Sequence, residues 1–386
     1  MKRRTILSST ALGLAAASLV ATQFAGSSAS AHTAPGHHRP DRPTSGKYQV
    51  VARFGDAMPT GITVSRHGRT FVSFPRLGDN VPFTVAEIRD GKAVAYPNAE
   101  VNRQDPADQA GHFQSVHSVV VDAADRLWVL DSGSPGFAGS SYGGPKLVAI
   151  DLHTNRVVKK IVFPRDVVPG NSYLNDIRFD LRRGRGGTAY ITDPLGTTGI
   201  IVVDLASGHS WRRLAGDPST APDKGFVSVL DGERVPNEFG VDGIAISPDG
   251  KRITYSPLSS HRLYSVSADA LANPRASDAQ VAATVRHLGY KPQADGLESD
   301  NKGRVYGADE EHNSIWRRYP DGTFKTIVQN DKLHWIDTLA VAADRHLYAI
   351  VNQFDRQGVF HNGKDLRQKP YLLVRLPINA GPAYLR

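Results

Sequence analysis

The chain of 386 residues contains no cysteine, is 40% hydrophobic and 22% charged, and has a formal net charge of +8. Without cysteine it forms neither disulfides nor thiolate metal sites, so a metal would need oxygen or imidazole ligands. The basic excess is mild, and no Lys/Arg run or nucleic-acid-binding motif accompanies it, so the composition does not indicate a nucleic-acid partner. The 36 Gly and 24 Pro favour β structure with many tight turns.

Residues 1–31 have the features of a signal peptide: a basic start (KRR), a short Ala/Leu-rich stretch, and a small-residue pattern that ends at Ala31. The paired arginines resemble a twin-arginine signal, which bacteria use to export folded proteins, although an ordinary secretory signal has the same general plan. We therefore expect a secreted protein, cleaved after Ala31, with no membrane span in the mature chain. Residues 32–46 are expected to form a flexible leader.

One pattern recurs six times along the rest of the chain: a small or polar residue, a short alternating apolar strand, a polar turn, and a second apolar strand. Each repeat leaves room for two further strands, such as KLVAIDL from Lys146 and GIIVVDL from Gly199. Four strands per repeat are typical of a propeller blade. The copies begin as TGITVSRHG at Thr60, HSVVVDAAD at His117, NDIRFDLRR at Asn175, DGIAISPDG at Asp242, DGLESDNKG at Asp295 and DTLAVAADR at Asp337.

Two further strands indicate how the ring of repeats closes. The segment KYQVVARF from Lys47 precedes the first repeat, and YLLVRLPI from Tyr371 follows the last. The two ends of the chain are therefore expected to share one blade, which leaves few free sheet edges. We predict an all-β, six-bladed β-propeller over residues 47–386. The alternative is a solenoid of six stacked β units, which would have shorter repeats.

The innermost strand of every propeller blade lines the central channel, so the residues that begin these strands should meet around one mouth of the channel. In this chain they form a ring of three carboxylates, an amide, an imidazole and a hydroxyl: Thr60, His117, Asn175, Asp242, Asp295 and Asp337. Neighbouring carboxylates repel one another unless a cation or hydrogen-bond donors balance them. A divalent cation is one such balance, and Ca²⁺ suits carboxylate and amide oxygens best.

We therefore predict a metal site formed by Asn175, Asp242 and Asp295, with His117 and Asp337 as candidates for proton transfer if the site is catalytic. Two other interpretations stay open: Asp and Asn before a strand often cap turns, and a polar ligand pocket needs no metal. A small-molecule ligand, cationic or aromatic, bound by a monomer would suit the acidic and aromatic neighbours of the ring. The expected ligand-binding residues are Thr60, His117, Tyr173, Glu238, Trp335 and Asp337.

Several segments resemble the major royal jelly and yellow protein family. They include PTGITVSRHGRTFVSFPR from Pro59, HSVVVDAADRLWVLDSG from His117 and GIAISPDGKRITYSPLSSHRLYSV from Gly243, and the similarity covers nearly all of residues 47–386. The resemblance implies a secreted six-bladed propeller, in agreement with the repeats. It implies no single function, because insect members are variously linked to dopachrome conversion, biogenic amine binding and nutrition. Those insect proteins usually contain cysteines, so a chain without them that carries an export signal suggests a bacterial member.

A more distant likeness is to the senescence marker and gluconolactonase group of metal-dependent lactonases. Asn175-Asp176, Asp242-Gly243 and Asp295-Gly296 are similar to motifs of that group, whereas Thr60 stands near the position of its first-blade glutamate ligand. We expect an exported propeller that binds or converts a small molecule. The alternatives are a metal-dependent lactonase-like hydrolase, a dopachrome-type isomerase or tautomerase, a non-catalytic binder of amines or aromatic metabolites, and a protein-interaction propeller.

Overall fold

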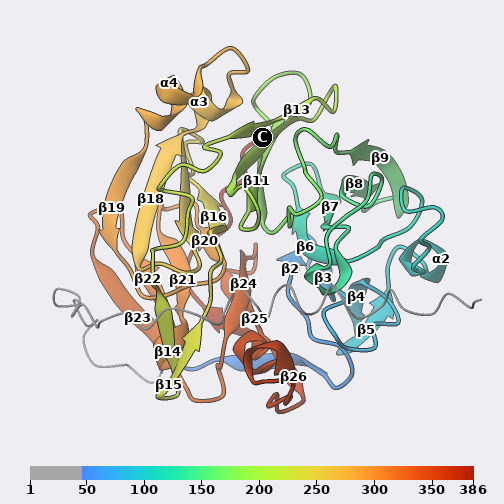
Figure 1. Cartoon of the computed structure of the whole chain (residues 1–386). Helices are drawn as coiled ribbons and strands as arrows, with labels where there is room; N and C mark the ends of the chain where they lie inside the picture. The colour runs from blue at the N-terminus through green and yellow to red at the C-terminus, as the bar shows by residue number, and fades with distance from the viewer. Residues whose placement is uncertain (1–45) are drawn as a thin grey trace, which may run out of the picture. The chain divides into compact units, whose positions relative to one another are not determined.

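The structure, a computed structural model, describes residues 46–386, so the predicted signal peptide and nearly all of the predicted leader lie outside the described residues. Within residues 46–386, six four-stranded antiparallel sheets are arranged radially around a central axis (Figure 1). This arrangement confirms the predicted six-bladed β-propeller. Each sheet forms one blade, and the first strand of each predicted repeat lies at the axis beside the first strands of its neighbours.

Five blades follow one another along the chain, each with its strands in sequence order from the axis outward. Blade 1 contains β2 (Ile62–Val64), β3 (Thr70–Ser73), β4 (Val85–Arg89) and β5 (Lys92–Ala95). Blade 2 contains β6 (Val116–Val121), β7 (Arg126–Asp131), β8 (Lys146–Asp151) and β9 (Arg156–Val162). Blade 3 contains β10 (Ile177–Asp180), β11 (Thr188–Asp193), β12 (Gly199–Asp204) and β13 (Ser210–Arg213). Blade 4 contains β16 (Val241–Ile246), β17 (Arg252–Pro257), β18 (Arg262–Ser267) and β19 (Arg286–Tyr290), and blade 5 contains β20 (Leu297–Ser299), β21 (Val305–Asp309), β22 (Ser314–Arg318) and β23 (Phe324–Gln329).

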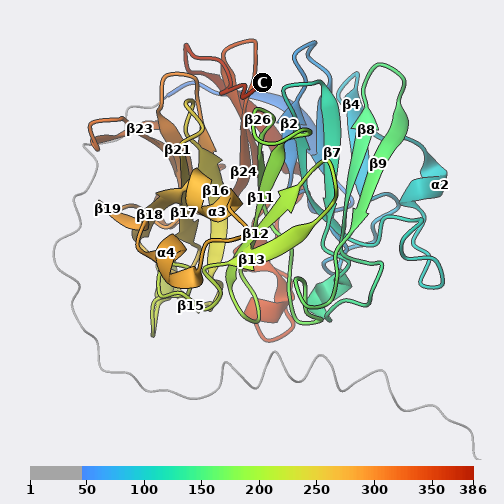
Figure 2. The same ribbon diagram turned by 90° about the horizontal axis from the view of Figure 1, so that it is seen from above.

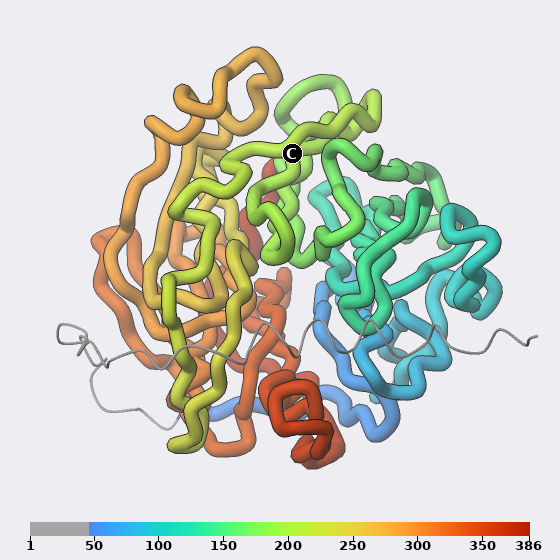
Figure 3. Tube along the Cα trace, viewed as in Figure 1, coloured from blue at the N-terminus to red at the C-terminus, as the bar shows by residue number. Residues whose placement is uncertain are grey.

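Blade 6 closes the ring by combining strands from both ends of the described chain. From the axis outward it contains β24 (Ile336–Val341), β25 (His346–Val351), β26 (Tyr371–Pro377) and β1 (Gln49–Phe54). Strands β1 and β26 pair antiparallel, with Gln49 opposite Arg375 and Phe54 opposite Tyr371. Figure 3 shows the blue start of the described chain running beside the red C-terminal part. The shared blade confirms the predicted closure, and its hydrogen bonds hold the first and last blades together.

The hydrophobic core is divided into six clusters, one between each pair of neighbouring blades. The cluster between blades 2 and 3 contains Trp128, which stacks on Phe179 with ring centroids 5.2 Å apart. The indole Nε1 of Trp128 donates to Asp122 over 2.7 Å, so its polar atom is satisfied inside the core. Because each blade packs on both neighbours, the axial strands are held in place on both sides.

Several elements outside the blades were not predicted from the sequence. The hairpin of β14 (Val227–Leu230) and β15 (Glu233–Pro236) lies between blades 3 and 4 in the chain. The helical elements are short: α2 (Ala99–Asn102), α3 (Ala268–Ala272), α4 (Asp278–Ala282), η1 (Pro135–Phe137), η2 (Glu310–His312), η3 (Phe354–Arg356) and η4 (Gly358–Phe360). None of the helices in the described part of the chain is both long and apolar enough to span a bilayer.

The two ends of the propeller axis carry different elements. The β14–β15 hairpin and the segment with η3 and η4 lie at one end, and the C-terminal residues lie at the other (Figure 2). Each end has its own cavity, one lined by the residues that begin the axial strands and one lined partly by the last residues of the chain.

Candidate functional site

Five of the six residues that begin the axial strands line one small cavity at a mouth of the channel. They are His117, Asn175, Asp242, Asp295 and Asp337. The sixth, Thr60, is fully buried and donates its hydroxyl hydrogen to the carbonyl of His117 over 2.7 Å, so its side chain joins blade 1 to blade 2 and does not line the cavity. The cavity has a volume of about 20 Å³. The repeats therefore bring together side chains that are far apart in the sequence.

Glycine follows two of the ring aspartates because neighbouring blades approach too closely for a side chain. A Cβ atom on Gly243 would lie 2.3 Å from the carbonyl oxygen of Asp295, and a Cβ atom on Gly296 would lie 2.5 Å from that of Asp337. Both distances are far below van der Waals contact. The Asp-Gly pairs thus allow the axial strands of blades 4, 5 and 6 to meet, and the close approach places their aspartates side by side.

Two ring carboxylates accept hydrogen bonds from neutral amides. Asn175 Nδ2 donates to Asp242 Oδ1 over 2.7 Å, which links blades 3 and 4. Asn352, which follows β25, donates from Nδ2 to Asp337 Oδ2 over 2.6 Å and to the carbonyl of Pro59 over 2.9 Å. Neutral donors satisfy the oxygens without neutralising their charge.

The third ring carboxylate accepts a hydrogen bond from an indole. Trp335 Nε1 donates to Asp295 Oδ2 over 2.7 Å, and the side chain of Trp335 is almost fully buried. The backbone of Trp335 has a φ of 56°, an uncommon conformation for a bulky residue. Residues held in such conformations cluster at functional sites, where the surrounding structure fixes a side chain in place.

Burial dominates the acidity of the ring carboxylates. It raises the pKa of Asp242 and of Asp337 well above the ordinary value, and the charge of nearby Asp295 raises both further. Burial likewise raises the pKa of Asp295, to about 6. Because the three groups are buried near one another, each ionised carboxylate makes ionisation of the next less favourable. A cation at this mouth would reverse that effect.

His117 and Tyr173 form a buried pair beside the carboxylates. His117 Nδ1 lies 3.0 Å from the Tyr173 hydroxyl, and the two rings meet edge to face. Burial lowers the pKa of His117 to about 3, so the imidazole is neutral at neutral pH. Burial, assisted by the charge of Asp337, raises the pKa of Tyr173 well above its ordinary value. His117 is therefore a weak base at neutral pH, and the pair offers the cavity neutral hydrogen-bonding groups.

Three phenylalanines cover the acidic ring, and we call them the aromatic cap: Phe137 in η1, Phe239 after β15, and Phe354 in η3. The Phe137 ring lies 4.6 Å from the Tyr173 ring and 6.2 Å from the Phe239 ring, and Phe239 lies 6.0 Å from Phe354. All three line the cavity together with the carboxylates. The cavity thus has an acidic floor and an aromatic wall.

The β14–β15 hairpin, which precedes Phe239, is fastened at its tip by Asp231. Arg356 Nη2 donates to Asp231 Oδ2 over 2.6 Å, and Asn313 Nδ2 donates to Asp231 Oδ1 over 3.3 Å. His334 Nδ1 lies 3.2 Å from the same carboxylate, and its Nε2 lies 2.8 Å from Asp355 Oδ1. The tip is therefore tied to blade 5 and to the loops that hold the aromatic cap.

The remaining predicted ligand-binding residues lie around the cavity and do not line it. Trp335 reaches the ring through its bond to Asp295. Glu238 is exposed beside Phe239. The three phenylalanines of the cap and Asn352 were not predicted, because they lie in loops outside the repeated pattern. Nothing in the sequence around Glu238 indicated that the next residue, Phe239, lines the cavity.

The sequence model of the family described as "Major royal jelly protein" matches residues 114–379. The chain belongs to this family. This member of the royal jelly family is 32% identical over 242 residues to Protein yellow of Drosophila madeirensis, an alignment that covers 57% of this chain and 42% of that protein. It is 30% identical over 208 residues to Major royal jelly protein 5 of Apis mellifera, which covers 52% of this chain and 34% of that protein. The chain therefore matches less than half the length of these relatives.

Solved structures share the fold of this royal jelly family member at low sequence identity. A calcium-binding protein, regucalcin, from Agrobacterium tumefaciens matches with a TM-score of 0.55 at 14% identity, covering 88% of this chain and 96% of that chain. A gluconolactonase from Xanthomonas campestris matches with a TM-score of 0.53 at 13% identity, covering 88% and 95%. These similarities support the propeller fold alone.

The ring of this royal jelly family member, as arranged, does not fit the predicted calcium ion. Within residues 46–386, no group of three or more His, Asp or Glu side chains is placed so that it could hold a metal. Asn175 turns its Nδ2 donor, and not its oxygen, towards Asp242. Calcium takes six to eight oxygen ligands, so this contact would have to reverse before the predicted trio could bind it. The metal site at Asn175, Asp242 and Asp295 stays a prediction.

Proposed function

We propose that this propeller binds a small organic cation with an aromatic or apolar body at the mouth formed by the axial strands. The observation that carries the proposal is the stacking of an aromatic cap on a buried ring of three carboxylates. The carboxylates would face the charged head of such a ligand, and the aromatic rings would contact its body. The expected export signal would place this binding outside the cytoplasm, and a monomer contains the whole site.

The charge of the ring favours a cationic ligand over a neutral one. Asp242, Asp295 and Asp337 are buried, and the donors that bond them are neutral. Ionised carboxylates are costly in such a place without a positive partner. An ammonium group would balance them, and the faces of Phe137, Phe239 and Tyr173 attract cations as well. An anion would be repelled.

The size of the cavity implies that the aromatic cap moves when a ligand binds. A volume of about 20 Å³ holds roughly one water molecule, which is less than an aromatic amine needs. The three phenylalanines lie in connections between blade strands, which rearrange more easily than the strands themselves. A ligand would enter by displacing the cap, and rings that now contact one another would contact the ligand.

The acid-base properties favour binding over conversion. His117, a candidate for proton transfer, has its pKa lowered to about 3 by burial, far from the range in which a general base works well at neutral pH. Asp337, the other candidate, has its pKa raised well above the ordinary value and bonds Asn352 and Thr338. A lactonase-like or isomerase activity would need His117 or Asp337 to have a pKa nearer to neutral pH, so that it could accept and release a proton.

Titration calorimetry with three matched probes tests the proposal. Tyramine, 4-ethylphenol and 4-hydroxyphenylacetate share one body and carry a cationic, a neutral and an anionic end. We expect tyramine to bind, 4-ethylphenol to bind at least about tenfold more weakly, and 4-hydroxyphenylacetate not to bind. Asp295→Asn should remove the preference for tyramine, whereas the exposed Glu238→Gln near the same mouth should keep it. Equal binding of tyramine and 4-ethylphenol would contradict the proposal.

The same experiment separates an organic cation from calcium. If Ca²⁺ alone binds, with heat that Asp242→Asn abolishes, and tyramine does not compete, then the ring is a metal site and our proposal is wrong. If tyramine binds equally with and without Ca²⁺, the carboxylates act on the organic cation directly.

A further inference from the structure

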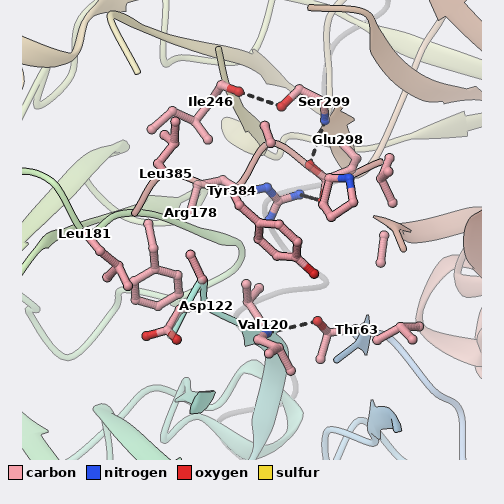
Figure 4. A pocket seen from close by; sticks show the side chains of 18 residues that line it. Thr63, Val120, Asp122, Arg178, Leu181, Ile246, Glu298, Ser299, Tyr384 and Leu385 are labelled. Carbon is pink, nitrogen blue, oxygen red and sulfur yellow. Dashed lines mark hydrogen bonds and ion pairs between the residues drawn. The ribbon is translucent and has the colours of Figure 1, made fainter. Parts of the chain in front are cut away.

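A second cavity lies at the opposite end of the channel from the acidic ring. It has a volume of about 80 Å³ and is lined by residues from the axial strands of all six blades (Figure 4). Residues 382–385 of the C-terminal segment complete its wall. We call it the tail cavity. It shares no lining residue with the acidic ring.

The C-terminal segment forms a roof that is fastened on two sides of the channel. On blade 5, Asn301 N donates to the Gly381 carbonyl over 2.9 Å, and Pro382 forms a single β-bridge with Asp300. On blade 3, Leu181 N donates to the Leu385 carbonyl over 2.9 Å, and the Leu385 side chain is buried. Between these attachments the segment crosses the mouth of the channel.

The middle of this roof is more exposed than its two attachments. Tyr384 is 40% exposed, and its ring lies 5.4 Å from the guanidinium carbon of Arg66 in blade 1. Two backbone hydrogen bonds to the blades and the buried Leu385 side chain hold the roof, so a ligand would enter by local movement of residues 382–384 between these attachments.

Arg178 lines the tail cavity, and within the described residues one of its buried donor atoms has no hydrogen-bond partner. Its side chain is 5% exposed, and its two terminal nitrogens donate to the carbonyls of Ile177 and Leu297. Its Nε has no hydrogen-bond partner among residues 46–386. A buried N–H of a charged group without an acceptor is costly, so a molecule in the cavity that offers an acceptor would be stabilised there.

The charges around Arg178 favour a neutral molecule. Glu298 Oε2 lies 3.5 Å from Arg178 Nη2, and Asp176 also interacts with the guanidinium. These two carboxylates would repel an anion, and the guanidinium would repel a cation. Most other lining groups are apolar, among them Val120, Ile246 and Ala340. The cavity therefore suits an apolar body with one uncharged acceptor.

We propose that the tail cavity is a second binding site, which takes a small neutral molecule with a carbonyl or hydroxyl oxygen directed at Arg178 and an apolar body beneath the C-terminal roof. Its volume corresponds to roughly five to eight water-sized groups. The site is independent of the proposed function, because it uses none of the residues of the acidic ring.

Nuclear magnetic resonance of the full chain with four matched probes tests this proposal. The probes are cyclopentanone, its hydrocarbon isostere methylenecyclopentane, and the charged analogues cyclopentylamine and cyclobutanecarboxylate. The readout is the Arg178 Nε–H resonance, assigned by its loss in Arg178→Lys. We expect cyclopentanone to shift this resonance saturably and the other three to bind at least about tenfold more weakly.

Variants that fill the cavity locate the binding. Ala340→Leu places extra carbons in the cavity and should abolish the cyclopentanone response. Val120→Ile is a milder change that should weaken it if the larger variant does not fold. If cyclopentanone leaves the Arg178 resonance unchanged, the cavity holds only water and the proposal is wrong. If cyclobutanecarboxylate bound as tightly as cyclopentanone, the proposal that the ligand is neutral would be wrong. Both results leave the tyramine test at the other mouth unaffected.

Discussion

Asn175 and Asp242 begin the axial strands of blades 3 and 4, and the Asn175 amide nitrogen donates to the Asp242 carboxylate over 2.7 Å. The contact spans 67 residues of sequence and joins two blades at the channel mouth. It also shows how the ring is balanced, because a neutral donor lies beside Asp242, where a fourth negative charge would repel the carboxylates. The identity of the residue at 175 therefore bears directly on the stability of the site.

Asn175→Asp should destabilise the protein, and more at pH 8 than at pH 5. The substitution removes a buried donor and adds a carboxylate beside Asp242, which we expect to cost about 2 kcal/mol in free energy of unfolding at pH 8. At pH 5 the new pair can share a proton, so the loss should be smaller. Urea unfolding at both pH values measures this, with the exposed Asn379→Asp as the control. An equal loss at the two pH values would show that charge is not the cause.

Asp295 should make the ligand-free protein less stable as the pH rises from about 4 to about 6. Burial raises its pKa from the ordinary value of 3.8 to about 6, so the folded protein keeps a proton that the unfolded chain has lost in this interval. The stabilisation from this group is complete below pH 3.8 and is lost as the pH rises through about 6. Urea unfolding of the wild type across this range should show the decline, and Asp295→Asn should reduce it. An identical slope in the variant would argue against this role.

The affinity for a cationic ligand should change in the opposite direction with pH. Tyramine keeps its charge across the range from pH 5 to 8, whereas Asp295 loses its proton as the pH rises through about 6. Binding should therefore tighten by about tenfold between these limits, since the ionised carboxylate attracts the ammonium group. Calorimetry at several pH values measures the change, and Asp295→Asn should flatten it. Affinity that is independent of pH in the wild type would place the ammonium group away from Asp295.

Gly243→Ala should destabilise the propeller, because the added Cβ would meet the carbonyl oxygen of Asp295 at 2.3 Å. Neither backbone can move without displacing its blade, so we expect a loss of about 3 kcal/mol. Gly55→Ala is a matched control, since a Cβ there has no atom within 4 Å outside its chain neighbours. Thermal unfolding of the two variants distinguishes them. A Gly243→Ala variant as stable as Gly55→Ala would mean that the axial strands separate easily.

The repeats and the two flanking strands were sufficient to predict the propeller, its closure and five of the six ring residues, because each copy places one residue at an equivalent point on the axis. Asp242 and Asp295 could thus be brought together from sequence alone. Phe137 and Phe354 could not, because they lie in loops of unequal length whose paths depend on tertiary contacts. The orientation of the Asn175 amide was equally hidden, since a side-chain amide offers both a donor and an acceptor. The predicted calcium site depended on the choice between them.

Asp231→Asn should loosen the β14–β15 hairpin while leaving the blades intact. The carboxylate bonds Arg356 and lies beside His334, and it is 45% exposed, so its removal should cost less than about 1 kcal/mol in global stability. Locally, faster hydrogen exchange is expected over residues 227–236, because the hairpin tip loses its attachment to the loop that holds Phe354. Hydrogen exchange measured by mass spectrometry provides the test, with the exposed Glu233→Gln in the same hairpin as the control. If the hairpin keeps its protection in Asp231→Asn, the packing of β14 against η2, and not the carboxylate, holds it over the site.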